Sequence, residues 1–155
     1  MENAMNSTED LPSLRERLVE TALEWQQRFG VAPHITSAIS EYDAALLVGC
    51  SEDAYSLQMA IRTAVGRGHD FTYEEKRYQV KANRPSGKPG SFVTLVAKAA
   101  NYEWDFLLWV LYDKSYVMQE AWLWQVDAYK SNFDHQKRIA PVDMRKGQCL
   151  YKAGG

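Results

Sequence analysis

Residues 106–112 of the chain read FLLWVLY, a continuous apolar run in which branched and aromatic side chains dominate. A short run of this kind, without alternation of polar and apolar residues, is typical of a strand buried on both faces of a sheet. A second strand is expected over residues 116–124, beyond the short turn Asp113-Lys114-Ser115. These two strands are the predicted centre of the fold.

The stretch before this strand has a different pattern. Residues 69–73 and 77–82 alternate between polar and apolar side chains and flank Glu74-Glu75-Lys76, which predicts a β-hairpin. Residues 83–91 read NRPSGKPGS, with two prolines, two glycines and no large apolar residue, which predicts a loop.

The first half of the chain has a helical pattern instead. Apolar residues recur at spacings of three and four over 11–29, and Gly30 is a natural stop. Further helices are expected from Ser37 or Ser40 to Val48, over 53–65, and over 126–133. Helices followed by strands around an apolar central strand predict an α/β (α+β) fold, a central mixed β-sheet flanked by helices.

The length of 155 residues corresponds to about one globular domain. We expect residues 1–36 to form an N-terminal helical extension and residues 37–155 to form the main domain. The N-terminus lacks the apolar segment of a signal peptide, and the apolar runs are too short to span a bilayer. With two cysteines, Cys50 and Cys149, better interpreted as reduced thiols, the sequence predicts a cytoplasmic protein without membrane contact.

Charge is distributed unevenly along the chain. The formal net charge of −2 argues weakly against a nucleic-acid partner. Residues 1–61, however, carry three basic and ten acidic side chains, whereas residues 62–98 carry eight basic and three acidic ones, a local net charge of +5. Such a segment indicates an anionic partner such as a phosphate backbone. The alternative is a solvated hairpin whose lysines protect its edge.

The residues with the clearest chemistry lie on the predicted hairpin. Gln79 and Lys81 are two positions apart, so on a strand they share one face, while Val80 points into the core. Asp70 lies on the partner strand and can present its carboxylate beside them. This set of groups suits a hydrated Mg²⁺ and the phosphate that it polarises, and Glu41 on a neighbouring helix can complete the metal ligands.

These residues carry a resemblance to a known family. Asp70 followed by residues 78–82 (YQVKA), after residues 40–45 (SEYDAA), resembles the PD-(D/E)XK nuclease superfamily. The closer similarity is to the branch with Gln in place of the second acid, as in Mrr-type restriction endonucleases. The apolar strand 104–112 after a basic loop also fits, and the resemblance covers about residues 38–125.

The resemblance implies a restriction-endonuclease-like core and Mg²⁺-dependent hydrolysis of DNA phosphodiester bonds in restriction or defence, with Mn²⁺ able to substitute. It implies Glu41, Asp70 and Gln79 as metal ligands and Lys81 as the catalytic lysine. Gln79 departs from the fuller motif, because a neutral oxygen replaces a carboxylate. Either Glu41 compensates for the lost charge, or the chain is a catalytically inactive module on the same fold that binds nucleic acid or another partner.

Contacts to DNA are expected from four basic side chains around this site, namely Arg67, His69, Arg84 and Lys88. The loop that holds Arg84 and Lys88 is equally well interpreted as an ordinary surface loop. A homodimer or a separate specificity subunit is expected for cutting both strands at chosen sites. A third interpretation is a structural or interaction protein whose aromatic strands form an interface.

Overall fold

The computed structural model describes residues 11–62 and 68–154, and the chain divides into two compact units, Met1–Ile35 and Thr36–Gly155. The first unit contains helix α2 (Leu14–Phe29). The side chain of Ser13 accepts a hydrogen bond from the Glu16 N–H at 3.1 Å, so the helix begins three residues later than its apolar pattern predicts. Gly30 ends the helix in the left-handed conformation at φ 89°.

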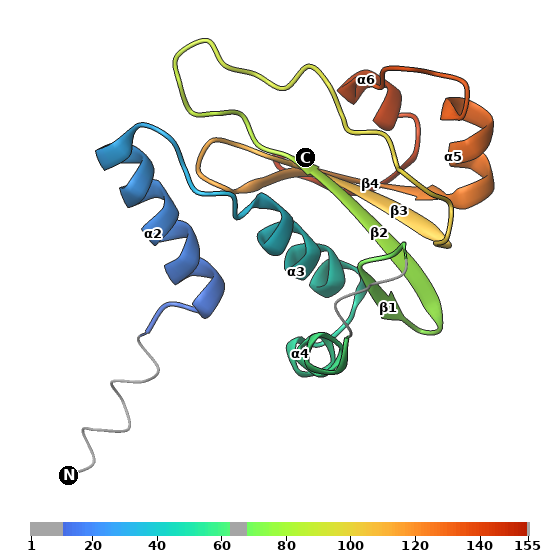
Figure 1. Ribbon diagram of the computed structural model, residues 1–155, viewed down its shortest axis with the longest axis horizontal. Helices are drawn as coiled ribbons and strands as arrows, with labels where there is room; N and C mark the ends of the chain where they lie inside the picture. Colours follow the sequence, from blue (N-terminus) through green and yellow to red (C-terminus); the bar gives the residue numbers. More distant parts are fainter. Residues whose placement is uncertain (1–10, 63–67, 155) are drawn as a thin grey trace. The chain divides into compact units, whose positions relative to one another are not determined.

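The second unit is built on a five-stranded mixed sheet (Figure 1). Its strands lie in chain order, β1 (Phe71–Tyr73), β2 (Lys76–Asn83), β3 (Phe106–Tyr112), β4 (Met118–Gln125) and β5 (Gln148–Lys152). Strands β2 and β3 are parallel, and the other neighbouring pairs are antiparallel. The predicted mixed sheet in an α+β fold is therefore confirmed, with β5 as a strand that the sequence did not indicate.

The parallel pair β2–β3 is joined in an unusual way. Parallel neighbours need a long crossover, which is usually a helix. The described residues 84–105 contain no helix and instead run as an extended segment over the sheet (Figure 1). The Val96 N–H donates to the Ile139 carbonyl at 2.8 Å, and the Lys98 ammonium donates to the Asp134 carbonyl at 2.6 Å. These bonds tie the crossover to the C-terminal part of the chain.

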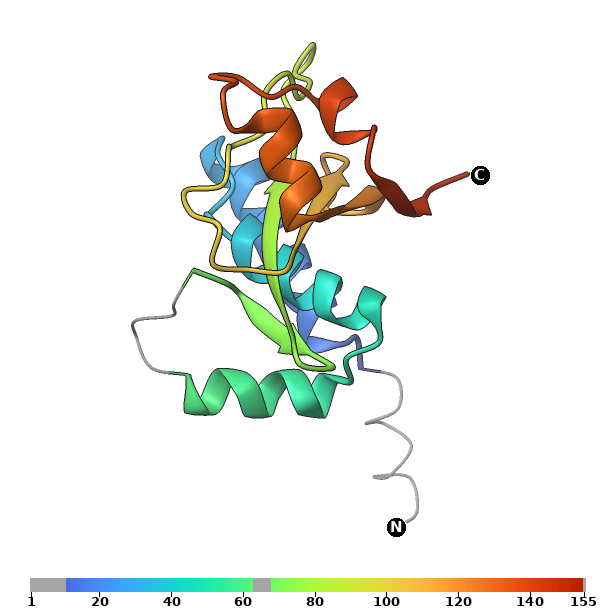
Figure 2. The same ribbon diagram turned by 90° about the vertical axis from the view of Figure 1, so that its right-hand side faces the viewer.

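Helices cover both faces of the sheet. Helix α3 (Thr36–Val48) packs on one face, and α5 (Val126–Phe133) and α6 (Pro141–Met144) lie on the other (Figures 1 and 2). Helix α4 (Glu52–Ile61) runs beside the β1–β2 hairpin (Figure 2). The boundaries of α5 agree with the prediction, whereas α4 ends before the predicted residue 65, which lies outside the described residues.

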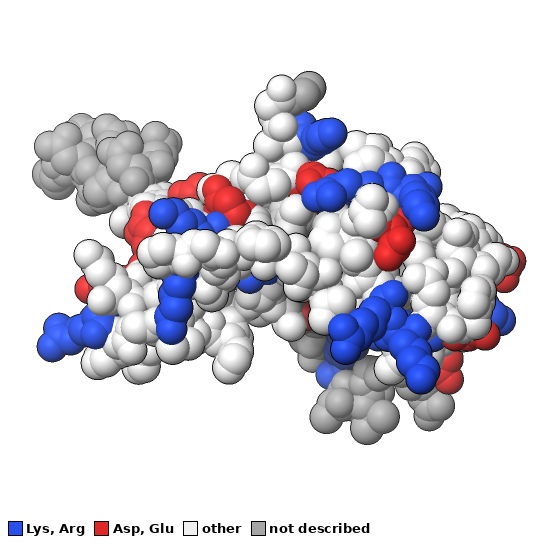
Figure 3. Space-filling view, turned by 90° about the horizontal axis from the view of Figure 1, so that it is seen from above, with Lys and Arg blue, Asp and Glu red and all other residues white. Residues whose placement is uncertain are grey.

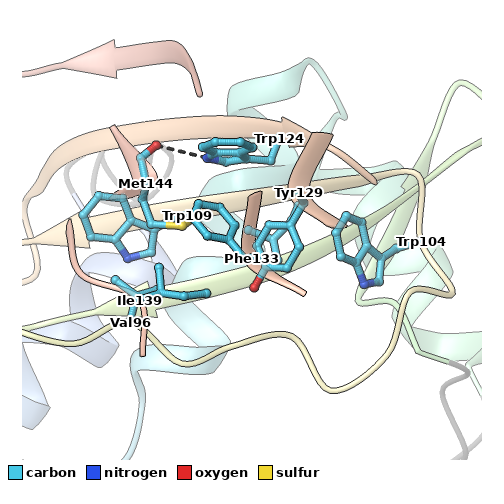
Figure 4. Close-up of a cluster of buried hydrophobic side chains, with 9 residues drawn as sticks. Val96, Trp104, Trp109, Trp124, Tyr129, Phe133, Ile139 and Met144 are labelled. Carbon is cyan, nitrogen blue, oxygen red and sulfur yellow. Dashed lines mark hydrogen bonds between the residues drawn. The ribbon is translucent and has the colours of Figure 1, made fainter. Parts of the chain in front are cut away.

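Strand β3 is buried on both faces, as its apolar run predicts, because Leu107, Leu108, Trp109 and Val110 are all inaccessible to solvent. On the α5 side its residues join a cluster that contains three of the five tryptophans (Figure 4). The members of this cluster are Val96, Trp104, Leu107, Trp109, Trp124, Tyr129, Phe133, Ile139 and Met144. Core packing is therefore the observed role of these tryptophans.

The opposite face fixes the position of α3. The Tyr112 hydroxyl on β3 donates to the Asp43 carboxylate on α3 at 2.6 Å. Phe71 and Tyr78 stack across β1 and β2, with ring centroids 4.9 Å apart and planes 3° from parallel. Since the Tyr112–Asp43 bond holds α3 against the strands, the side chain of Glu41, half a turn before Asp43, is brought to the edge of the sheet.

Candidate active site

A cavity of about 330 Å³ opens where α3 meets the end of β2. Glu41, Asp70, Gln79 and Lys81 all contribute to its walls, so residues that are far apart in the sequence come together here. The complete lining is Thr36, Ser37, Ser40, Glu41, Asp70, Gln79, Val80, Lys81, Ala82 and Ala97. Most of these side chains are polar, and they come from α3, from β2, from the residue before β1 and from the crossover.

The cavity exists because β1 is much shorter than β2. Strand β1 pairs with residues 76–78, so residues 79–83 extend beyond it with no strand partner on that side in the described chain. The sequence predicted Asp70 within a strand, whereas in the structure Asp70 directly precedes β1. Its N–H donates to the Tyr78 carbonyl at 2.7 Å, and its Oδ2 accepts from the Val80 N–H at 2.7 Å. Asp70 therefore supplies a hydrogen-bond partner for Val80 at the edge that β1 leaves open.

Gln79 and Lys81 share one face of β2, as their spacing predicts. Their partners on β3 are Leu107 and Trp109, whereas the side chain of Val80 is buried on the other face. Within residues 11–62 and 68–154, the Lys81 ammonium forms no hydrogen bond or ion pair with a side chain or main-chain group. It is therefore available to an anionic ligand that enters the cavity.

The two carboxyl groups of the cavity interact directly. Burial, the charge of Asp70 and a hydrogen bond between the two carboxyl groups raise the pKa of Glu41 from 4.5 to about 7, against the opposing charge of Arg62. Near neutral pH the pair thus holds a proton for part of the time. A bound cation can replace this proton and neutralise the negative charge of the two adjacent carboxylates.

The raised pKa predicts how stability depends on pH. The folded state binds the Glu41 proton more tightly than the unfolded chain does. The resulting contribution to the free energy of unfolding is therefore complete below about pH 4.5 and is lost as the pH rises through about 7. We expect Glu41→Gln to flatten the fall in unfolding free energy over this window. Urea unfolding of both proteins between pH 4.5 and 7 measures the difference, and parallel profiles would exclude an interaction of this kind at Glu41.

Tyr55 on α4 is a neighbour of the site that the sequence analysis did not identify. Its phenol has a pKa raised to about 12 by burial and by the negative charges of Glu41 and Asp70. Tyr55 therefore stays protonated across the physiological range and can act as a hydrogen-bond donor. The sequence contains no signal for this proximity, because it depends on how α4 packs against α3.

Arg84, a predicted DNA contact, has a structural role. Its guanidinium donates two hydrogen bonds to the Lys114 carbonyl, at 2.9 and 2.6 Å, and stacks over the Tyr116 ring at 4.3 Å. These contacts hold the turn between β3 and β4, where Tyr116 has a left-handed φ of 62°. Since its donors are engaged with the turn, Arg84 is a weaker candidate for binding phosphate than the sequence suggests.

Of the other predicted DNA contacts, Lys88 and His69 do not line the cavity. Lys88 is exposed in the crossover, His69 precedes Asp70 with its carbonyl bonded to Arg62, and Arg67 lies outside the described residues. On the face seen in Figure 3, Lys and Arg side chains form separate groups with Asp and Glu side chains among them. The basic segment 62–98 is thus partly used for internal contacts.

Comparison of the chain with protein-family models gives no match, and comparison with curated proteins gives none either. None of the helices within residues 11–62 and 68–154 combines the length and the apolar character that a membrane span requires.

Proposed function

We propose that the chain is a Mg²⁺-dependent DNA endonuclease with a restriction-endonuclease-like core of the Mrr type. The observation that carries this proposal is the common cavity of Glu41, Asp70, Gln79 and Lys81. Two carboxylates, an amide and an ammonium that pairs with no other described residue lie at one sheet edge, and this set of groups suits the hydrolysis of a phosphodiester. A role in restriction or another defence against mobile elements follows from the resemblance.

The donor set fits a hard divalent cation. Mg²⁺ prefers oxygen ligands and is usually bound through one or two carboxylates, with the remaining positions taken by water and substrate oxygens. Glu41, Asp70 and Gln79 supply such oxygens. Burial and the charge of Asp70 raise the pKa of Glu41, and a cation bound between the two carboxyl groups would oppose both effects. These three side chains would hold Mg²⁺ or Mn²⁺, which when bound supplies an activated water and stabilises charge on phosphate.

The chain's own groups have separate roles in this proposal. Lys81 faces the phosphate, where its ammonium neutralises charge on the non-bridging oxygens and orients the attacking water. Thr36 and Ser37 form the first turn of α3 and line the same cavity. The N–H groups and the positive dipole at this end of the helix favour a phosphate on that side.

The proposed partner is DNA, bound through its phosphate backbone. Cutting both strands of a duplex requires two active sites or two successive reactions, so a homodimer is part of the proposal. A separate specificity subunit would supply sequence recognition.

One observation favours a second candidate, a module that binds nucleic acid without cutting it. Gln79 supplies a neutral oxygen to the cavity where the resemblance implies a carboxylate, and among the described residues no group of three or more His, Cys, Asp and Glu side chains is arranged to hold a metal. A site with one negative charge fewer binds a cation more weakly. In that case the fold would retain a phosphate-binding face around Lys81.

A plasmid-nicking assay tests the proposal. The purified chain is incubated with supercoiled DNA in Mg²⁺, in Mn²⁺ and in EDTA. The endonuclease predicts relaxed and linear products with either metal and none in EDTA. Salt-sensitive DNA binding without cleavage in either metal would contradict the endonuclease and favour the binding module. A chain that neither cuts nor binds DNA would contradict both and favour the structural or interaction protein.

A further inference from the structure

Helix α4 holds the outer side of the segment that carries Asp70. The Gln58 side chain bonds Thr72 in both directions, donating to its carbonyl at 2.7 Å and accepting from its N–H at 2.8 Å. One helical turn later, the Arg62 guanidinium donates to the carbonyls of His69 and Asp70, each at 2.7 Å. The side chains of Gln58 on α4 and of Arg62, the residue that follows the helix, thus bind the main chain as a further strand would.

Three polar groups of Asp70 form hydrogen bonds that fix its position. Its N–H is bonded to Tyr78, its Oδ2 to the Val80 N–H and its carbonyl to Arg62. Of these three bonds, the one to Arg62 comes from outside the hairpin. It also places a positive charge close enough to Glu41 to oppose the effect of Asp70 on that carboxyl group.

We infer that Arg62 is a positioning residue for the site, whose two-pronged contact with the carbonyls of His69 and Asp70 sets the Asp70 carboxylate against Val80 and Glu41. A guanidinium presents parallel donors in a fixed plane, which matches two successive carbonyls. An ammonium keeps the charge but cannot make both bonds in this geometry. The importance of this contact for metal binding rests on the proposed function, whereas its effect on the position of Asp70 does not.

Hydrogen exchange at the Val80 amide tests the inference without any metal. This N–H is bonded to the Asp70 carboxylate, so its exchange rate reports how often that carboxylate moves away. Arg62→Lys is expected to speed exchange at Val80 by about tenfold. Arg62→Gln, which also removes the charge, is expected to have at least this effect.

Arg145→Lys is the matched control. Arg145 makes a comparable two-pronged contact, to Glu120 at 2.7 and 2.8 Å, and neither residue lines the cavity. Its replacement costs a similar contact and is expected to leave Val80 exchange unchanged. Wild-type exchange at Val80 in Arg62→Lys and Arg62→Gln would overturn the inference, and so would equal acceleration in Arg145→Lys.

Mn²⁺ titration followed by electron paramagnetic resonance separates this inference from the proposed function. If the site binds metal, Arg62→Lys is expected to weaken Mn²⁺ binding by about tenfold, within the range for partners that orient metal ligands. Wild-type protein that binds no Mn²⁺ would contradict the proposed function, and the exchange at Val80 would still decide the role of Arg62. Unchanged Mn²⁺ affinity in Arg62→Lys would show that Arg62 does not contribute to metal binding.

Discussion

Replacing Lys81 with alanine is expected to lower the rate of DNA cleavage by about 10²–10⁴-fold, the usual contribution of a positioned proton-transfer or charge-stabilising group. The ammonium lines the cavity and forms no bond with another described residue, so its removal breaks no contact of the fold. DNA binding and the melting temperature should therefore stay close to wild type. Single-turnover cleavage of a labelled duplex, with binding measured by fluorescence anisotropy, separates these effects.

Lys88→Ala is the control for charge. Lys88 is an exposed lysine of the crossover that does not line the cavity. Its loss should leave the cleavage step intact and at most reduce the salt dependence of binding by the contribution of about one phosphate contact. Equal losses of cleavage in the two variants would show that Lys81 acts through general attraction for DNA and not through the reaction.

Replacing Asp70 with asparagine is expected to abolish metal-dependent cleavage while the fold is retained. Loss of an outer partner of a metal ligand typically costs about 10- to 100-fold, so loss of a ligand should cost at least about 100-fold. The amide oxygen of asparagine can still accept from the Val80 N–H. Without the Asp70 charge, the pKa of Glu41 should fall from about 7 towards its ordinary value.

Two measurements check this variant. Cleavage rates over a series of Mg²⁺ concentrations report the metal dependence, and carbon-detected NMR titration of the Glu41 carboxyl reports its pKa. Asp70→Ala, which also loses the bond to Val80, should be less stable than Asp70→Asn. An unchanged Glu41 pKa in Asp70→Asn would contradict the interaction of the two carboxyl groups, and wild-type cleavage would contradict the role of Asp70.

Local patterns were sufficient to predict the centre of the fold. Seven apolar residues in succession indicated β3, and the alternation around Glu74-Glu75 indicated the hairpin. Both patterns reflect burial on the two faces of a strand, which is a local property of the sequence. Helix α5 has the predicted boundaries, with the Gln125 side chain accepting from the N–H groups of its first turn.

Elements that depend on distant partners could not be predicted in this way. Strand β5 has mostly exposed or half-buried residues, so no apolar pattern marks it. It exists because it pairs with the open edge of β4. The contacts of Arg84 with Lys114 and Tyr116 likewise join segments that sequence spacing cannot bring together.

The candidate site was also predictable only in part. The spacing of Gln79 and Lys81 was enough to put both on one face of β2. Their proximity to Glu41 was predicted from its place on a neighbouring helix and depends on the packing of α3, which the Tyr112–Asp43 bond maintains. The contribution of Arg62 had no signal in the sequence, because it acts on main-chain carbonyls that any residue could provide.

An anomalous difference map from a crystal soaked in MnCl₂ tests the central claim most directly. The proposal predicts a manganese peak in the cavity, bonded to carboxylate oxygens of Glu41 and Asp70 with Gln79 beside it. Bond lengths close to the ~2.1 Å of small divalent cations with oxygen are expected. A crystal with manganese bound elsewhere and none between Glu41 and Asp70 would contradict a metal-dependent active site at this edge of the sheet.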